Sequence, residues 1–285
     1  MAMKLAFERF GEGARPVLLL HGFMGSRHAW ELVRPALEPH VHALAVDLPG
    51  HGESGIPPVS ERAGYEATLE ALAALVEGEL GGQADVIGYS QGARLALALA
   101  SRHPDRVRRL VMESGSPGLH ARKERSLRRE EDARRALQLE REGVERFVDQ
   151  WEALSLFSGL AKLPGDVRQR LRARRVGQRA EGLAWALRSL GTGVQPDLWP
   201  ALPHVRAPTL LLTGEDDPKY TQLARRMAAE LPVVWRHSIP GCTHTPHLEA
   251  PAIWASEVLG FLSTPWYDVS EPGDEPTLKS GVTAS

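Results

Sequence analysis

Hydrophobic residues gather in short runs separated by polar loops, and these runs alternate with segments of helical periodicity. Seven short segments contain apolar residues in the patterns of strands. They predict strands at residues 4–9, 17–22, 41–47, 84–89, 107–113, 208–213 and 233–239. The periodic segments predict helices near residues 28–37, 60–80, 92–102, 221–230 and 249–262. This alternation predicts an α/β fold with a mostly parallel central sheet and helices on both faces.

The alternation stops between Glu113 and Ala207, where long, charged, helix-favouring runs extend from Arg122 to Arg146 and from Arg168 to Arg188. A helical cap inserted into the sheet domain accounts for this interruption. After Pro265 the sequence has no apolar period, which is typical of disorder. The sequence therefore predicts a core of residues 1–114 and 201–264, a cap of residues 115–200 and a disordered tail of residues 265–285.

The overall composition indicates one enzyme-sized globular unit. With 285 residues, of which 42% are hydrophobic, the chain can bury a large core. The net charge of -2 gives no reason to expect a nucleic-acid partner. The amino terminus has no signal-like apolar segment, and the apolar runs are far below the ~20 residues of a membrane span. The single cysteine, Cys242, excludes an internal disulfide and fits a reducing compartment, so we expect a cytoplasmic protein without membrane insertion.

Positive charge is concentrated in the predicted cap. Residues 122–188 contain 17 Lys and Arg against 11 Asp and Glu, a net charge of +6. Because the whole chain has a net charge of -2, the remaining residues together have a net charge of -8. Most of these arginines are explained by Glu–Arg pairs on solvated helices. A positive cap over a catalytic site would nevertheless favour an anionic substrate.

The strongest chemical signal is the turn Gly88-Tyr89-Ser90-Gln91-Gly92, which lies between a predicted strand and a predicted helix. In a G-x-S-x-G turn the serine has a strained backbone conformation at the tip of a sheet. Small residues on either side let the strand and the helix approach closely. The pattern therefore predicts Ser90 as a reactive side chain that projects from the scaffold.

Two loops that follow later predicted strands contain the acid and the base that a reactive serine needs. Asp217 follows the strand predicted at 208–213 and His244 follows the strand predicted at 233–239, in the Ser, Asp, His order of α/β hydrolases. His21, His51 and His247 are rejected as the base, because they belong respectively to the turn after the strand at 17–22, to the loop after the strand at 41–47 and to the start of the last helix. His244 and His247 lie on a loop broken by proline, so no metal site is expected.

Two longer segments make the pattern specific. Gly88-Tyr89-Ser90-Gln91-Gly92-Ala93-Arg94, together with Leu20-His21-Gly22-Phe23-Met24-Gly25-Ser26, resembles the 2-succinyl-6-hydroxy-2,4-cyclohexadiene-1-carboxylate synthase (MenH) family of menaquinone biosynthesis, within the α/β-hydrolase superfamily. An arginine four residues after the serine is typical of that family. Further similar stretches are 116–119, 124–128, 147–151, 191–199 and 214–220, so the resemblance covers roughly residues 3–263.

The resemblance implies an α/β-hydrolase fold and a lyase reaction. The family removes a proton from 2-succinyl-5-enolpyruvyl-6-hydroxy-3-cyclohexene-1-carboxylate and eliminates pyruvate. Carried onto this chain, Ser90 would be the general base, tuned by His244 and Asp217, and the backbone amides of Phe23 and Gln91 would form the oxyanion hole. No metal or organic cofactor is implied.

The family substrate carries several carboxylates, so the resemblance also implies arginines around it. By position in the matching motifs, Arg94, Arg128 and Arg175 would bind substrate, and Tyr89 and Trp151 would form pocket walls. For Trp151 a purely core role is the alternative. Neighbouring arginines could replace two of the three, namely Arg125 or Arg129 for Arg128, and Arg172, Arg174 or Arg179 for Arg175.

Three function classes follow from these residues. The first is the lyase, and the second is a serine hydrolase of small carboxylated substrates, an esterase or a carbon–carbon bond hydrolase, with the same triad. Arg94 and the cap arginines favour the lyase, because burying guanidinium groups is costly without anionic partners. The third is a non-catalytic binding protein, against which the intact Ser90, Asp217 and His244 argue. We expect a small anionic substrate as the partner, and a monomer is favoured although the sequence leaves the oligomeric state open.

Overall fold

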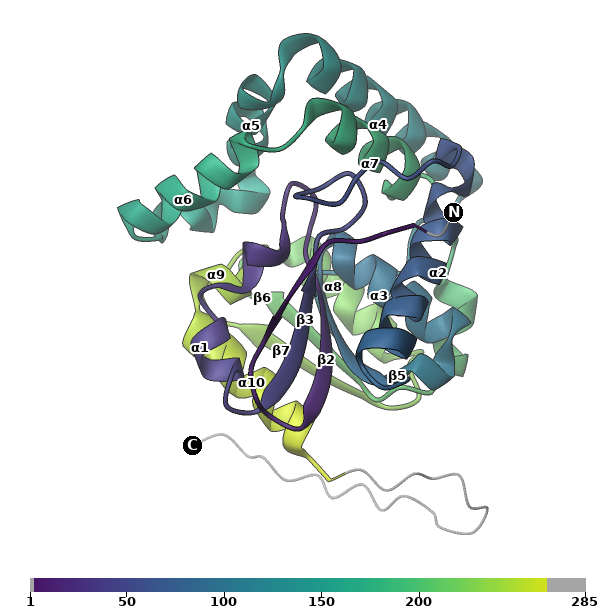
Figure 1. Cartoon of the computed structure of the whole chain (residues 1–285), viewed down its shortest axis with the longest axis vertical. Coiled ribbons are helices and arrows are strands. Elements are labelled where there is room, and N and C mark those ends of the chain that lie inside the picture. Colours follow the sequence, from purple (N-terminus) through teal and green to yellow (C-terminus); the bar gives the residue numbers. More distant parts are fainter. Residues whose placement is uncertain (1–2, 266–285) are drawn as a thin grey trace.

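A seven-stranded sheet forms the centre of the molecule (Figure 1). The computed structural model describes residues 3–265. The strand order is β1-β3-β2-β4-β5-β6-β7, with β1 antiparallel to β3 and the other neighbours parallel. The strands are β1 Phe7–Phe10, β2 Arg15–Leu20, β3 Val41–Val46, β4 Ala84–Tyr89, β5 Val107–Glu113, β6 Thr209–Gly214 and β7 Val234–Ile239. The predicted mostly parallel sheet is therefore confirmed.

Helices cover both faces of this sheet, as the sequence predicted. The α-helices outside the cap are α1 Arg34–Leu37, α2 Glu61–Glu79, α3 Gln91–Arg102, α8 Pro218–Ala228, α9 Pro246–Glu249 and α10 Pro251–Ser263. Short 3-10 helices lie at Arg27–Trp30, Pro104–Arg106, Ser155–Lys162 and Trp199–His204. Among the helices of residues 3–265, none combines the length and the apolar character that a membrane crossing needs.

Alternating residues of the central strands build two separate cores. On β2, Leu18 and Leu20 pack with α2 and α3 on one face. Val17 and Leu19 pack with α10 on the other face. Successive side chains of a strand point to opposite faces, so a strand buried on both sides reads as one continuous apolar run. This double burial explains why the central strands were visible in the sequence.

Four further α-helices lie between β5 and β6, above one end of the sheet in Figure 1. They are α4 Arg122–Glu142, α5 Val144–Glu152, α6 Gly165–Val176 and α7 Ala180–Leu190. Their inner faces share an apolar cluster with Met24 of the loop after β2. The division into a core of residues 1–114 and 201–264 and a cap of residues 115–200 stays a prediction that fits this arrangement.

Several predicted helices are broken where the backbone cannot continue. The charged run from Arg122 to Arg146 is interrupted at Gly143, whose φ of 82° is unfavourable for other residues. The helix predicted at 249–262 is confirmed as α10, which begins at Pro251 and is separate from the short α9, because Pro251 has no N–H to donate. The helix predicted at 28–37 is a 3-10 turn followed by the short α1. The first strand is shifted from 4–9 to residues 7–10. Residues 266–285 of the predicted tail lie outside the described residues.

Candidate active site

Ser90 occupies the sharp turn between β4 and α3. Its backbone has φ 51° and ψ -105°, a conformation that only a strongly constrained non-glycine residue adopts. A Cβ on Gly88 would lie 2.5 Å from the Ala93 nitrogen, and a Cβ on Gly92 would lie 2.0 Å from the Leu20 oxygen. The close approach of β4, α3 and the end of β2 therefore requires glycine at both positions.

We expect Gly92→Ala to lower the free energy of unfolding by about 2 to 3 kcal/mol, because its methyl group would overlap the Leu20 carbonyl. Gly78→Ala in α2 is the matched control, since nothing lies within 4 Å of a Cβ there and alanine favours a helix. Urea unfolding of both variants measures the difference. An unfolding midpoint of Gly92→Ala equal to that of the unmodified protein would contradict this account of the turn.

The side chains of Ser90, His244 and Asp217 form one hydrogen-bonded chain. Ser90 Oγ lies 3.1 Å from His244 Nε2, and His244 Nδ1 lies 2.8 Å from Asp217 Oδ2. A carboxylate only accepts, so Nδ1 carries the proton and Nε2 is the acceptor for the serine hydroxyl. The imidazole and the carboxylate are buried, with 1% and 2% of each side chain exposed. This arrangement can withdraw a proton from Ser90 Oγ.

The other three histidines near the site are held elsewhere. His247 Nδ1 lies 2.7 Å from Glu113 Oε1, and the Trp254 indole donates to the other oxygen of that carboxylate at 2.9 Å. Burial lowers the pKa of His21 to about 4 and that of His51 to about 3. The structure therefore brings His244, and none of these three rings, to Ser90 Oγ.

The predicted oxyanion residues flank Ser90 on two elements. Gln91 is the first residue of α3, so its N–H has no carbonyl four residues earlier within the helix. Phe23 lies in the turn after β2, beside Gly22, where an added Cβ would be 3.4 Å from Ser90 Cβ. The Gly25 N–H closes this turn on the Gly22 oxygen at 2.9 Å. Their role as oxyanion donors stays a prediction.

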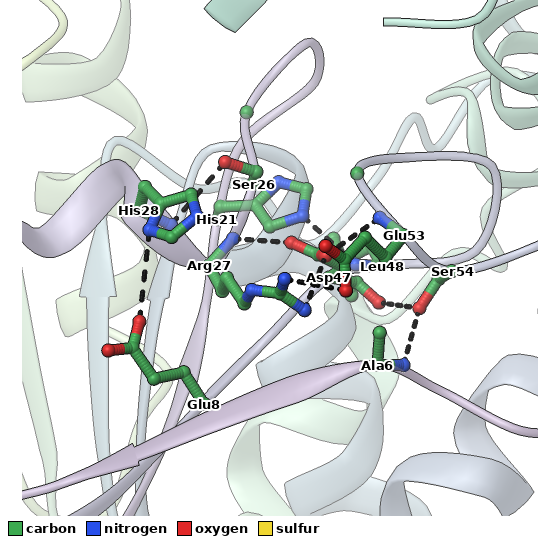
Figure 2. A network of polar contacts seen from close by, with 12 residues as sticks. Ala6, Glu8, His21, Ser26, Arg27, His28, Asp47, Leu48, Glu53 and Ser54 are labelled. Atoms are coloured by element: carbon green, nitrogen blue, oxygen red, sulfur yellow. Dashed lines mark hydrogen bonds and ion pairs between the residues drawn. The ribbon is translucent and has the colours of Figure 1, made fainter.

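A partly buried polar network holds the turn after β2 against the loop after β3 (Figure 2). The Asp47 carboxylate accepts from the Arg27 N–H at 2.6 Å and from the Glu53 N–H at 2.9 Å. The Leu48 N–H donates to His21 Nε2 at 2.9 Å, so His21 carries its proton on Nδ1, which donates to the Gly22 oxygen at 2.7 Å. The peptide that bears the Phe23 N–H is thus oriented by an uncharged imidazole.

An open pocket lies over Ser90, between the sheet and the cap. Its space, including the mouth, is about 750 Å³, which suits a small molecule. The lining includes Phe23, Tyr89, Ser90, Trp151, Phe157 and Arg175. Trp151 also packs against Phe147 and Phe157, with ring centroids 5.8 and 5.7 Å away. Trp151 is therefore both a pocket wall and a core aromatic.

Arg175 is the predicted substrate arginine that reaches this pocket. It is buried on α6, and its Nη1 donates to Glu152 Oε1 at 2.8 Å. The neighbouring Arg174 lines the pocket as well and pairs with Glu31 at 2.7 Å. Arg172 pairs with Asp149 at 2.8 Å. Arg179 donates to the Ser54 oxygen at 2.5 Å. Neither Arg172 nor Arg179 lines the pocket.

Arg94 and Arg128 lie outside the lining of the pocket. Arg94 is only 9% exposed, and its Nη1 donates to the Leu190 oxygen at 3.0 Å and to Gln195 Oε1 at 3.1 Å. Burial lowers the pKa of its guanidinium group, and within residues 3–265 no carboxylate forms an ion pair with it. Arg128 is paired with Asp132 at 2.8 Å. Arg94 is therefore not an exposed arginine of the helix surface, and the substrate roles of both arginines stay predictions.

The structure adds aromatic neighbours of His244 that the sequence did not single out. The Tyr220 ring lies 4.4 Å from the His244 ring, and the Phe157 ring lies 5.9 Å from it. The Tyr220 N–H donates to Asp217 Oδ1 at 3.2 Å, and Tyr220 lies three residues after Asp217, in the first turn of α8. The start of a helix directly after Asp217 is the sequence feature that could have indicated Tyr220. Phe157 lies in an irregular 3-10 segment, which has no periodic signal.

Comparison with known proteins agrees with this geometry. The alpha/beta hydrolase family model matches residues 17–257. A Bacillus subtilis (strain 168) protein, provisionally named as a 2-succinyl-6-hydroxy-2,4-cyclohexadiene-1-carboxylate synthase, is 36% identical over 87% of this chain and 90% of its own length. The Enterobacter sp. (strain 638) protein of that name is 33% identical over 89% of this chain and 94% of its own length.

Two solved structures superpose on nearly the whole chain. MenH from S. aureus superposes with a TM-score of 0.85 at 32% identity, covering 92% of this chain and 98% of its own. A thermophilic esterase from Thermogutta terrifontis superposes with a TM-score of 0.77 at 27% identity, covering 91% of this chain and 93% of its own. The chain is thus an enzyme on the α/β-hydrolase fold and belongs to the 2-succinyl-6-hydroxy-2,4-cyclohexadiene-1-carboxylate synthase (MenH) family.

Proposed function

We propose that this enzyme eliminates pyruvate from 2-succinyl-5-enolpyruvyl-6-hydroxy-3-cyclohexene-1-carboxylate and releases 2-succinyl-6-hydroxy-2,4-cyclohexadiene-1-carboxylate. The observation that carries the proposal is the hydrogen-bonded chain of Ser90, His244 and Asp217, which ends in a pocket lined by Arg175. Two relatives that bear the name of this synthase are 36% and 33% identical to the chain in sequence. Their alignments cover 87% and 89% of it. The reaction belongs to menaquinone biosynthesis and needs no cofactor.

The chemistry begins at ring carbon C2, next to the succinyl ketone. Ser90 Oγ, whose own proton passes to His244 Nε2, removes the C2 proton. The electron pair forms the C2–C3 double bond, the former C3–C4 double bond moves to C4–C5, and the C5–oxygen bond breaks. The enolpyruvate that leaves takes up a proton to become pyruvate. Asp217 keeps the imidazole in the tautomer that accepts at Nε2 and stabilises the imidazolium that forms.

Negative charge develops on the ketone oxygen as the proton leaves C2. The N–H groups of Phe23 and Gln91 are proposed to donate to that oxygen, because both are backbone donors beside Ser90. The substrate carboxylates require cations around the ring. Arg175 can serve one of them from the pocket wall by leaving or sharing its bond to Glu152. Arg94 and Arg128 are proposed for the others.

A serine hydrolase of small carboxylated substrates is the second candidate. The structural similarity to the Thermogutta terrifontis esterase favours it, since the same fold at 27% identity supports ester hydrolysis in that protein. In a hydrolase Ser90 would attack a carbonyl carbon and form an acyl enzyme, whereas in the lyase it would only carry a proton. The covalent state of Ser90 during turnover therefore separates the two functions.

We expect the purified enzyme to release pyruvate from the cyclohexene substrate at a rate far above its hydrolysis of p-nitrophenyl acetate. A coupled lactate dehydrogenase assay measures the pyruvate. Intact-protein mass spectrometry after a rapid quench should detect no substrate-derived adduct on Ser90, because a general base forms no covalent bond to carbon. A stoichiometric adduct, or ester hydrolysis without pyruvate release, would replace the lyase with the hydrolase.

A further inference from the structure

Gln178 links the cap directly to the turn that bears the Phe23 N–H. It is half-buried in the segment between α6 and α7. Its Nε2 donates to the Gly25 oxygen at 2.8 Å, and its Oε1 accepts from the Gly52 N–H at 2.8 Å. One primary amide of the cap therefore joins the loop after β2 to the loop after β3. The bridge needs a donor and an acceptor on the same side chain, which glutamine supplies.

The contact at Gly25 bears on the predicted oxyanion donor. The Gly25 N–H and His21 Nδ1 both donate to the Gly22 oxygen, at 2.9 and 2.7 Å. In a trans peptide the carbonyl and the following N–H point in opposite directions, so fixing the Gly22 oxygen fixes the direction of the Phe23 N–H. The turn from Gly22 to Gly25 is thus held at its first carbonyl by His21 and at its last carbonyl by Gln178.

Gln178 is also close in sequence to Arg175, one of the arginines that line the pocket. Arg175 is three residues before Gln178, at the end of α6, and lines the pocket over Ser90. The cap also meets the loop after β3 where the backbones of Gly182 and Gly50 touch, since a Cβ on either would lie within 2.3 Å of the other's oxygen. The junction between α6 and α7 is therefore packed against the loop after β3, and the side chain of Gln178 also bonds this junction to the turn after β2.

We propose that Gln178 is a positioning residue that holds the Phe23 N–H in place relative to the cap arginine Arg175. This inference rests on the proposed function, in which Phe23 donates to an oxyanion and Arg175 to a substrate carboxylate. Through Gln178, hydrogen bonds add to the packing of cap on core in setting the distance between these two groups. Loss of the bridge leaves substrate binding by Arg175 intact and misplaces the oxyanion donor.

Two substitutions test the bridge, and a neighbour serves as the control. Gln178→Met keeps the length of the side chain and removes both hydrogen bonds. Gln178→Glu keeps an acceptor for the Gly52 N–H and loses the donor to the Gly25 oxygen. Arg179→Met is the matched control, because Arg179 belongs to the same junction but donates to the Ser54 and Gly52 oxygens and not to the turn.

We expect both Gln178 variants to lower kcat for pyruvate release about tenfold with KM within twofold, because the oxyanion donor acts in the transition state. Hydrogen exchange of peptides covering residues 20–27 should become faster in both variants, and Arg179→Met should leave kcat and this exchange near their original values. An equal fall of kcat in Arg179→Met, or unchanged exchange of the turn in Gln178→Met, would overturn the inference. Exchange is measured without substrate, so it tests the bridge even if the enzyme releases no pyruvate and the proposed function fails.

Discussion

Ser90→Ala should lower the rate of pyruvate release by at least about 10³-fold, because the proposed base is removed while the pocket remains. The thermal midpoint should change by no more than about 2 °C, since Ser90 Oγ bonds only His244 among residues 3–265 and does not cap α3. Steady-state kinetics and calorimetry on the same preparation measure both quantities. Turnover by Ser90→Ala close to that of the unmodified enzyme would remove Ser90 from the mechanism.

Ser114→Ala is the matched control for this experiment. Ser114 also has a positive φ, 50°, and follows the neighbouring strand β5. Its hydroxyl is buried without a hydrogen-bond partner among the described residues, and it does not line the pocket. Its removal should leave turnover within about twofold. A large loss in both variants would point to backbone disturbance at the strand ends instead of to chemistry at Ser90.

The parts of the fold that were predictable from sequence are those in which one local rule decides the outcome. The strands at 84–89 and 107–113 were predicted with the observed bounds, because burial on both faces makes their middle residues, 86–87 and 110–112, apolar. The Ser90 turn was predictable because glycines at 88 and 92 are required by backbone contacts. Asp217 and His244 followed from chain order, and their hydrogen-bonded geometry with Ser90 agrees with the role assigned to them.

The cap was predictable as helical but not in its contacts. A charged helix such as α6 can turn any of several arginines inward, so spacing alone could not separate Arg174 and Arg175, which both line the pocket, from Arg172 and the nearby Arg179. No sequence pattern indicated a role for Gln178, because that role depends on contacts with two loops more than a hundred residues earlier in the chain. Contacts between residues so far apart in the sequence leave no periodic pattern of hydrophobic or polar residues.

Arg94→Ala should reduce kcat/KM for the tricarboxylate substrate by about 30- to 1000-fold, which is ~2 to 4 kcal/mol for an ionic hydrogen bond lost in a desolvated site. The guanidinium group is buried, and neutral acceptors, Leu190 O and Gln195 Oε1, are its observed partners. Burying a charge beside neutral groups is costly, and an anionic substrate would offset that cost. Hydrolysis of a neutral ester should hardly change, and Arg94→Lys should recover part of the loss, since an ammonium group lacks the planar two-donor geometry.

If Arg94 has only a structural role, its substitution should have a different effect. Arg109→Ala is the variant with which Arg94→Ala is compared. Arg109 is also buried, and its guanidinium group donates to backbone oxygens at the end of α10, among them Leu262 O at 2.7 Å, away from the pocket. Arg109→Ala should lower the thermal midpoint and leave kcat/KM for charged and neutral substrates unchanged. If Arg94→Ala behaves in the same way, its bonds to Leu190 and Gln195 only anchor the end of α7. If instead its loss is confined to the charged substrate, with the midpoint preserved, the buried cation binds a carboxylate and the lyase is favoured over an esterase, because a neutral ester has no anion to place there.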